Sequence, residues 1–329
     1  MKVKWTPACL LGVQVNFPGL AKTIGFQEMS FIMNMETMFG RVFFQIGDVA
    51  GHVDNSHRGP FSDGDTTRRS EPFTGETATV LHVTSNAWIE LLDETAAAVV
   101  NALATFDRWG DGGDRPDQYA LDQIADAAVL EVLKPTGVSI LSEESGFLKG
   151  ETSELMIVDP VDGSTNASRR IPHYCTSLCV VDEQGPLAAV VLNLANGERF
   201  HATRQGGAFL NDQPIEPTNC EQLSDAIIGV AGTPPTNVTP RQYRSFGAAA
   251  LDLCSVAAGR LDGYIDPLAH HGVWDYAAAI LICVEAGAVV GELQGRQLIH
   301  SDHSLRLGPV AAATPELLNQ LGVEQSIDR

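Results

Sequence analysis

Two aspartates follow an apolar run in the middle of the chain, and hydroxyl and amide side chains come directly after them. Residues 155–158 predict a buried strand, and the string that follows is Asp159-Pro160-Val161-Asp162-Gly163-Ser164-Thr165-Asn166. Ligands of open α/β sheets bind at the carboxyl ends of strands. Carboxylates there suit a divalent cation, and a glycine permits the tight reversal that turns N–H groups toward a phosphate. We therefore expect the aspartates to hold metal and the turn to hold phosphate.

Three more carboxylates stand at the ends of expected elements. Glu143 follows a strand expected at 138–141, Asp275 opens a helix expected at 274–286, and Asp122 lies in the first turns of a helix expected at 118–133. Glu143 and Asp275, with the two aspartates above, are enough ligands for a two-metal site, whose ions lie about 3.5–4 Å apart. The backbone carbonyl of Val161 is a plausible fifth ligand. No His or Cys cluster has the spacing of a zinc site.

Two competing motifs fail on spacing. An EF-hand needs Glu at its twelfth position, but the twelfth residue counted from Asp159 is Arg170. A phosphatase with an aspartyl nucleophile would show Asp-x-Asp, whereas the spacing here is Asp-x-x-Asp. An ordinary loop or cap role stays open for Glu143 or Asp275 taken alone.

Several motifs occur in an order that resembles the inositol monophosphatase family, within the metal-dependent, lithium-sensitive phosphatases. The resemblance covers about residues 85–325. It is carried by these strings: Leu141-Ser142-Glu143-Glu144-Ser145, the stretch from Asp159 to Asn166, Gly206-Gly207-Ala208-Phe209-Leu210-Asn211, the helix within 249–262, and Trp274-Asp275-Tyr276-Ala277-Ala278 with Glu285-Ala286-Gly287.

The resemblance implies a role for each matching residue. The implied metal ligands are Glu143, Asp159, Val161 (through its carbonyl), Asp162 and Asp275. The implied phosphate and substrate contacts are Gly163, Ser164, Thr165 and Asp266. The implied catalytic residues are Glu143, Asp122 and Ser164, of which the last two position and deprotonate the attacking water.

The sequence also departs from the family pattern. Ser164 stands where the family usually has Thr, but the hydroxyl is kept. Ala167 stands where an aromatic residue is common, so we expect a different pocket rim. The segment 266–275 is longer than in typical members, which leaves the substrate open. His270 and His271 within it are expected to be a solvated loop pair rather than substrate contacts.

Composition limits the classes of partner and the cellular compartment that we expect for the protein. The 329 residues carry 41 acidic and 21 basic side chains, a formal net charge of −20. Such a surface repels a nucleic-acid backbone, so we expect no nucleic-acid partner. No apolar run reaches the ~20 residues that span a membrane, and no signal peptide is recognised. The six Cys include no C-x-x-C pair and are expected to be reduced, in a cytoplasmic protein.

The chain divides near residue 83. Residues 1–83 lack sustained periodicity and are expected to be a poorly ordered N-terminal extension, with a start codon assigned too far upstream as an equal alternative. From residue 84 to 329 helices and strands alternate, which predicts one α/β domain. The resemblance implies a layered αβαβα sandwich of the inositol monophosphatase and fructose-1,6-bisphosphatase type.

The resemblance implies a phosphomonoesterase that depends on two or three Mg2+ ions. A metal-activated water attacks phosphorus directly, and no phosphoenzyme forms. The expected substrate is a small phosphorylated metabolite, with inositol monophosphate first. The alternatives are histidinol phosphate, fructose 1,6-bisphosphate and 3′-phosphoadenosine 5′-phosphate; a non-catalytic metal- or phosphate-binding protein is disfavoured because all the matched carboxylates are present. The resemblance also suggests a homodimer.

Overall fold

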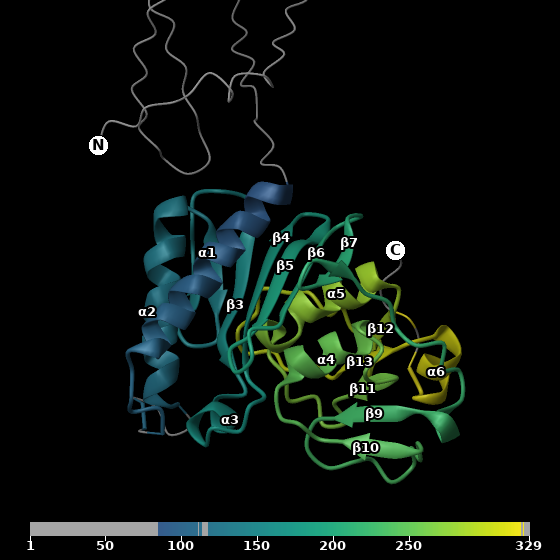
Figure 1. Ribbon diagram of the computed structural model, residues 1–329. Helices are drawn as coiled ribbons and strands as arrows, with labels where there is room; N and C mark the ends of the chain where they lie inside the picture. The colour runs from purple at the N-terminus through teal and green to yellow at the C-terminus, as the bar shows by residue number, and fades with distance from the viewer. Residues whose placement is uncertain (1–84, 111, 114–117, 324, 326–329) are drawn as a thin grey trace, which may run out of the picture. The chain divides into compact units, whose positions relative to one another are not determined.

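Two β-sheets and three layers of helix make up the described part of the protein (Figure 1). The structure is a computed structural model that describes residues 85–110, 112–113, 118–323 and 325. The predictions for residues 1–83 lie outside it. Helices α1 (Ser85–Ala104) and α2 (Ala120–Leu133) cover one face of the first sheet. Helices α4 (Ala249–Ala257) and α5 (Ala277–Ala286) lie between the sheets, and α6 (Pro315–Gln320) packs on the far face of the second sheet. The αβαβα sandwich is confirmed.

The first sheet has eight strands within the described residues, in the order β2-β1-β3-β4-β5-β6-β7-β8. From β3 onward it is an antiparallel meander. The strands are β1 (Ser139–Ser142), β2 (Gly146–Leu148), β3 (Leu155–Asp162), β4 (Cys175–Asp182), β5 (Gly185–Asn193), β6 (Arg199–Thr203), β7 (Gly207–Leu210) and β8 (Gln213–Pro214).

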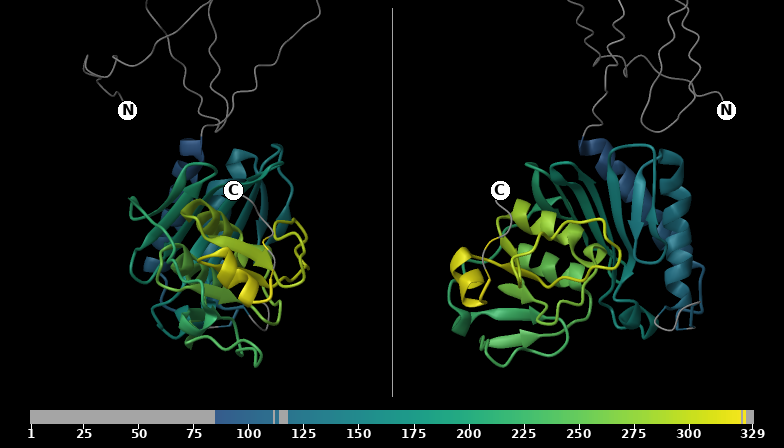
Figure 2. Two further views of the ribbon diagram at one scale, coloured as in Figure 1. Left: turned by 90° about the vertical axis from the view of Figure 1, so that its right-hand side faces the viewer. Right: turned by 180° about the vertical axis from the view of Figure 1, so that it is seen from behind.

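The second sheet has five strands in the order β10-β9-β11-β13-β12, and it faces α4 and α5 (Figure 2). The strands are β9 (Ile227–Val230), β10 (Gln242–Arg244), β11 (Gly263–Ile265), β12 (Val289–Glu292) and β13 (Pro309–Ala312). The α-helices are α1 (Ser85–Ala104), α2 (Ala120–Leu133), α3 (Ser164–Ser168), α4 (Ala249–Ala257), α5 (Ala277–Ala286) and α6 (Pro315–Gln320). Among the described residues, no helix combines the length and apolar character needed to cross a membrane.

Alternation along the strands divides the core. In β4, Leu178 and Val180 face α1 and α2, while Cys175 and Cys179 face α4 and α5. Helix α5 is apolar nearly all round, and seven of its residues are buried, because it has a sheet on each side. Helices therefore cover both faces of the first sheet. This packing holds in place the sheet edge at which the strands that carry the site end.

Two expected boundaries were wrong, and helix α4 begins inside its expected range. Strand β3 does not stop at Val158 but continues through Asp162, with an irregular register between Asp159 and Asp162 opposite β4. Helix α4 begins at Ala249, because Gly247 has a φ of 88° and Ala248 is extended. A 3₁₀ turn (Val273–Asp275) precedes α5, so Asp275 ends that turn instead of opening the helix.

A buried carboxylate secures the end of β12. Glu292 is 1% exposed, accepts N–H groups from Gln294 (2.8 Å), Arg296 (3.0 Å) and Gly308 (3.2 Å), and pairs with the Arg296 guanidinium. Burial alone would raise the pKa of Glu292, but Arg296 and the amides bring it down to about 2. The ionised carboxylate therefore stabilises this corner of the second sheet.

We expect Glu292→Gln to lower the free energy of unfolding at pH 7 by about 1–3 kcal/mol. The folded pKa lies below the ordinary value of 4.5, so this contribution is present above about pH 4.5 and is lost as pH falls toward 2. Urea unfolding at pH 7 and pH 3 measures it, with Glu183→Gln, on an exposed turn, as the control. An equal deficit at both pH values would contradict the assignment.

Candidate active site

Three carboxylates from separate segments meet at one edge of the first sheet. Glu143 follows β1, Asp159 lies in β3, and Asp275 ends the turn before α5; one oxygen of each lies within 4.8 Å of the others. Strands β1 and β3 are parallel with Ser142 opposite Val158, and the Glu143 N–H donates to the Val158 carbonyl at 3.1 Å. The parallel register thus places Glu143 beside Asp159, as the sequence predicted for strands ending together.

The electrostatics of this group fit a bound cation. Burial raises the pKa of Glu143 and of Asp159 well above the usual range, and the charges of neighbouring acids raise them further. Asp159 Oδ1 accepts the Val161 N–H at 3.0 Å, but its buried Oδ2 has no hydrogen-bond partner. Carboxylates packed side by side, one of them buried with an unsatisfied oxygen, are costly unless a positive charge compensates them. The donor set is all oxygen, which hard divalent cations prefer.

Asp162 and Val161 lie next to this group. Asp162 is buried, and its Oδ2 accepts the Ala250 N–H at 2.7 Å from the start of α4. Burial, and then the charge of Asp275, raises the pKa of Asp162 to about 7. The Val161 carbonyl accepts the Ser164 hydroxyl at 2.7 Å; a carbonyl oxygen has a second lone pair, which leaves it able to bind a cation.

The turn after Asp162 requires glycine. Gly163 has a φ of 86°, and a Cβ there would lie 3.1 Å from three atoms: the Ala248 Cβ and the carbonyl oxygens of Gly247 and His173. Asn166 fastens the same turn, since its Nδ2 donates to the carbonyls of His173 (2.8 Å) and Phe246 (2.7 Å). The predicted phosphate turn is therefore packed tightly against the start of α4.

Helix α2 brings Asp122 to the same edge. Asp122 is 3% exposed, its Oδ2 accepts the Tyr119 N–H at 2.9 Å, and its charge contributes to the raised pKa of both Glu143 and Asp159. The Tyr119 hydroxyl lies 3.4 Å from Thr165 Oγ1. Tyr119 thus connects Asp122 to the phosphate turn. The sequence did not predict this role, because none of the recognised motifs contains Tyr119.

The expectation of a solvated histidine pair was wrong for one member. His270 is exposed, but the His271 side chain is only 18% exposed and lies beside Asp275, with Nδ1 at 3.2 Å from Oδ2. Burial alone would lower the pKa of His271, but its hydrogen bond to Asp275 and the nearby acids raise it to about 9. The ion pair with Asp275 holds the His271 ring away from solvent. The spacing of residues in the sequence did not predict this contact.

Two further expectations meet a different geometry. Ala167 is fully buried against α2 and the first sheet, so it belongs to the core and the expected change of pocket rim was wrong. Asp266 is also fully buried, and it accepts the N–H groups of Leu268 (3.1 Å) and His270 (2.7 Å). In this conformation Asp266 shapes its own loop; direct contact with a substrate stays a prediction.

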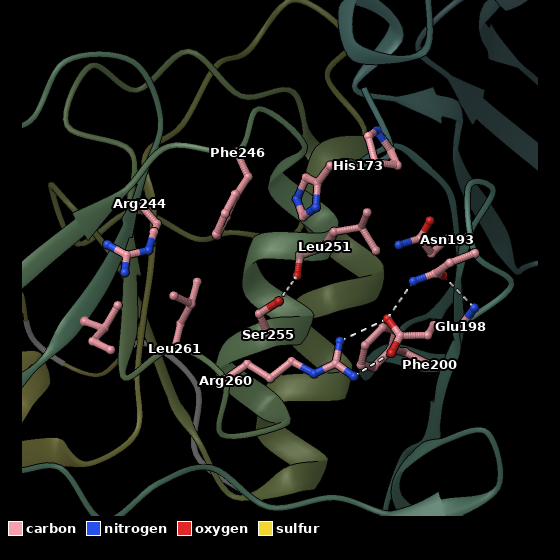
Figure 3. Close-up of a pocket in the computed structure, with 13 residues that line it drawn as sticks. His173, Asn193, Glu198, Phe200, Arg244, Phe246, Leu251, Ser255, Arg260 and Leu261 are labelled. Atoms are coloured by element: carbon pink, nitrogen blue, oxygen red, sulfur yellow. Dashed lines mark hydrogen bonds and ion pairs between the residues drawn. The ribbon is translucent and has the colours of Figure 1, made fainter. Parts of the chain in front are cut away.

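A cavity of about 360 Å³ lies beside α4, and none of these carboxylates lines it (Figure 3). His173, Phe246, Ser255 and Arg260 are among its lining residues, and none of the predicted site residues lines it. Convergent carboxylates with raised pKa values are a more specific sign of chemistry than the size of a hollow. We therefore place the candidate site at the acidic cluster and not in this cavity.

The comparison with protein families finds a match over most of the chain. The model of the inositol monophosphatase family matches residues 89–325. The chain belongs to this family. Its members are metal-dependent phosphatases, and the protein is accordingly a phosphoric monoester hydrolase, as the sequence predicted.

Individual relatives carry different names. The fructose-1,6-bisphosphatase/inositol-1-monophosphatase of Archaeoglobus fulgidus is 36% identical over 211 residues, which cover 62% of this chain and 82% of that protein. The Nus factor SuhB of Pasteurella multocida is 33% identical over 222 residues, which cover 61% of this chain and 79% of that protein. The solved structure of an extragenic suppressor from Pyrococcus furiosus is 28% identical with a TM-score of 0.65, covering 72% of this chain and 100% of that one.

We expect Gly163→Ala to impair both stability and phosphatase turnover, because it adds crowding to an unfavourable φ. Gly197→Ala is the matched control: its φ of 81° is similar, but a Cβ there meets nothing within 4 Å. The control should cost about 1 kcal/mol in urea unfolding and leave turnover intact, whereas Gly163→Ala should cost more. Equal losses in the two variants would contradict the packing argument.

Proposed function

We propose that this protein is a Mg2+-dependent phosphomonoesterase that hydrolyses a small phosphorylated metabolite, with inositol monophosphate as the first candidate. The observation that carries the proposal is the convergence of Glu143, Asp159 and Asp275 within 4.8 Å. The glycine turn at Gly163 directly follows β3, the strand that contains Asp159. The proposed cation ligands therefore lie next to the residues proposed for the phosphate.

The cation would be held by Glu143, Asp159, Asp162, Asp275 and the carbonyl of Val161. Mg2+ bound there would supply Lewis-acid chemistry, which lowers the pKa of water and stabilises the leaving oxygen. Five oxygen donors cannot complete the coordination of two or three ions by themselves. Water and substrate phosphate would supply the remaining ligands, as is usual for Mg2+ in proteins.

The proposed work of the neighbouring residues follows from their positions. Ser164 Oγ, now donating to Val161, and the carboxylate of Asp122 would orient the attacking water, and Asp122 would accept its proton. The backbone N–H groups of Gly163 and Ser164 and the Thr165 hydroxyl would bind the phosphate oxygens. Phosphorus is then attacked directly by water, without a phosphoenzyme.

The alternatives remain histidinol phosphate, fructose 1,6-bisphosphate and 3′-phosphoadenosine 5′-phosphate. One relative's name joins fructose-1,6-bisphosphatase with inositol-1-monophosphatase, which keeps a sugar bisphosphate in consideration. Another is named a Nus factor, but the net charge of −20 opposes direct contact with nucleic acid in this chain. A cytoplasmic homodimer is part of the proposal, and light scattering of the purified protein tests the dimer.

A phosphate-release panel of these four substrates, with Mg2+ and with EDTA, tests the function. We expect release that requires Mg2+ and is fastest with inositol monophosphate. Release that is fastest with another member would replace the substrate and keep the reaction. No release from any member would instead favour a non-catalytic metal- or phosphate-binding protein.

We expect Asp159→Asn to reduce turnover at least 10³-fold, because a neutral amide cannot compensate the charge of the cation. The protein should stay folded, because the substitution removes a buried charge. Turnover and circular dichroism are the measurements. Asp182→Asn is the control, since Asp182 lies at the far end of β4 and pairs with Arg204 at 2.7 Å. Full activity of the Asp159 variant would refute the ligand assignment.

The raised pKa of Asp162 predicts a link between pH, cation and stability. Between the ordinary value of 3.8 and about 7, the folded protein keeps a proton that the unfolded chain has released. The contribution of Asp162 to the free energy of unfolding therefore falls as pH rises through this range. In EDTA, the midpoint of thermal unfolding should fall more from pH 5 to pH 8 in the wild type than in Asp162→Asn.

Added Mg2+ should reverse the trend. At pH 8 it should raise the midpoint of the wild type more than that of Asp162→Asn, because the cation compensates a carboxylate that only the wild type has. The amide can still accept the Ala250 N–H, so the start of α4 is preserved. Parallel responses of the two proteins to pH and to Mg2+ would contradict the role of Asp162.

A further inference from the structure

A chain of three side chains ends on one of the proposed metal ligands. The Tyr264 hydroxyl lies 2.7 Å from His271 Nε2, and His271 Nδ1 lies 3.2 Å from Asp275 Oδ2. A carboxylate oxygen only accepts, so Nδ1–H is the donor to Asp275. The same Oδ2 also accepts the Gly272 N–H at 2.8 Å. Two donors on one oxygen fix the rotation of the Asp275 carboxylate.

The imidazole is itself held on its far side. Tyr264 is 1% exposed and comes from β11, so its hydroxyl has a fixed position. It can donate to a bare Nε2 or accept from Nε2–H, and the ring is therefore oriented in either protonation state. Asp266 Oδ2 also approaches Nε2, at 3.9 Å.

The backbone of His271 is fixed as well. Its N–H donates to the Leu307 carbonyl at 3.2 Å, and its carbonyl accepts the Leu307 N–H at 2.9 Å. The turn that Asp266 organises through the N–H groups of Leu268 and His270 leads directly into this pairing. The long segment 266–275 therefore places one histidine, and not its neighbour, between the second sheet and Asp275.

We propose that His271, oriented by Tyr264, is a positioning residue that fixes Asp275 for binding of a divalent cation. This inference rests on the proposed metal dependence. Partners that orient a metal ligand typically change the affinity for the metal 10–100-fold when they are removed. His271 has no assigned contact with substrate or with the reacting atoms, so its effect should be seen in cation binding itself.

Amide variants separate the role from simple packing. In His271→Asn the side-chain amide can reach the position of Nδ1 and still donate to Asp275, whereas in His271→Gln the amide lies near the position of Nε2 and that donor is lost. Tyr264→Phe removes only the hydroxyl. His270→Ala is the matched control, because His270 is exposed and its backbone N–H, the group that Asp266 accepts, is retained.

The measurement is the Kd for Mg2+ by isothermal titration calorimetry on the full chain, without substrate, together with the Mg2+ concentration that gives half-maximal phosphate release. We expect His271→Gln to weaken Mg2+ binding about 10–100-fold, His271→Asn to stay within about threefold of the wild type, and Tyr264→Phe to fall between them. The control should match the wild type.

Equal weakening in the Asn and Gln variants would overturn the positioning role, because a packing defect does not depend on where the amide lies. Unchanged affinity in the Gln variant would overturn it too, and would leave the proposed function intact. Failure of the wild type itself to bind Mg2+ is a separate result that would overturn the proposed function and this inference together.

Discussion

The cost of burying several carboxylates side by side is the constraint on which the site depends. Glu143 and Asp159 have raised pKa values for two joint reasons, removal from water and mutual repulsion. Each buried and uncompensated charge costs several kcal/mol. A fold tolerates such a cluster only if its segments are held independently of it. Here three clusters of buried apolar residues, which pack the helices against the two sheets, hold the segments. The carboxylates of the site lie at the edge of the first sheet, outside these clusters.

Backbone contacts join the segments that carry the acids. The Ser177 hydroxyl from β4 donates to the Trp274 carbonyl at 3.2 Å, one residue before Asp275. His303 Nε2 donates to the Glu143 carbonyl at 3.1 Å, and its ring lies 4.6 Å from that of Trp274. The Ala250 N–H holds Asp162. The segments of Asp275 and Glu143, and the carboxylate of Asp162, are thus held by hydrogen-bond donors that do not share the negative charge of the acids.

The sequence predicted the parts of this arrangement that depend on local patterns. Periodicity placed the helices α2 and α5 to within a few residues, and strand-end reasoning together with the family motifs identified the carboxylates that converge. Contacts between distant segments that lie outside these motifs could not be predicted. The pairing of Tyr119 with Thr165 spans 46 residues, and strand β10 is a short edge strand with few apolar residues. No local pattern encodes either of them.

The two histidines show where sequence reasoning stops. His270 and His271 are chemically identical and adjacent, and composition treats them alike. Only the pairing of His271 with Leu307, 36 residues away, decides which ring turns inward to meet Asp275. The reaction class follows from the family to which the chain belongs, whereas the orientation of His271 depends on a contact between distant segments that no motif contains.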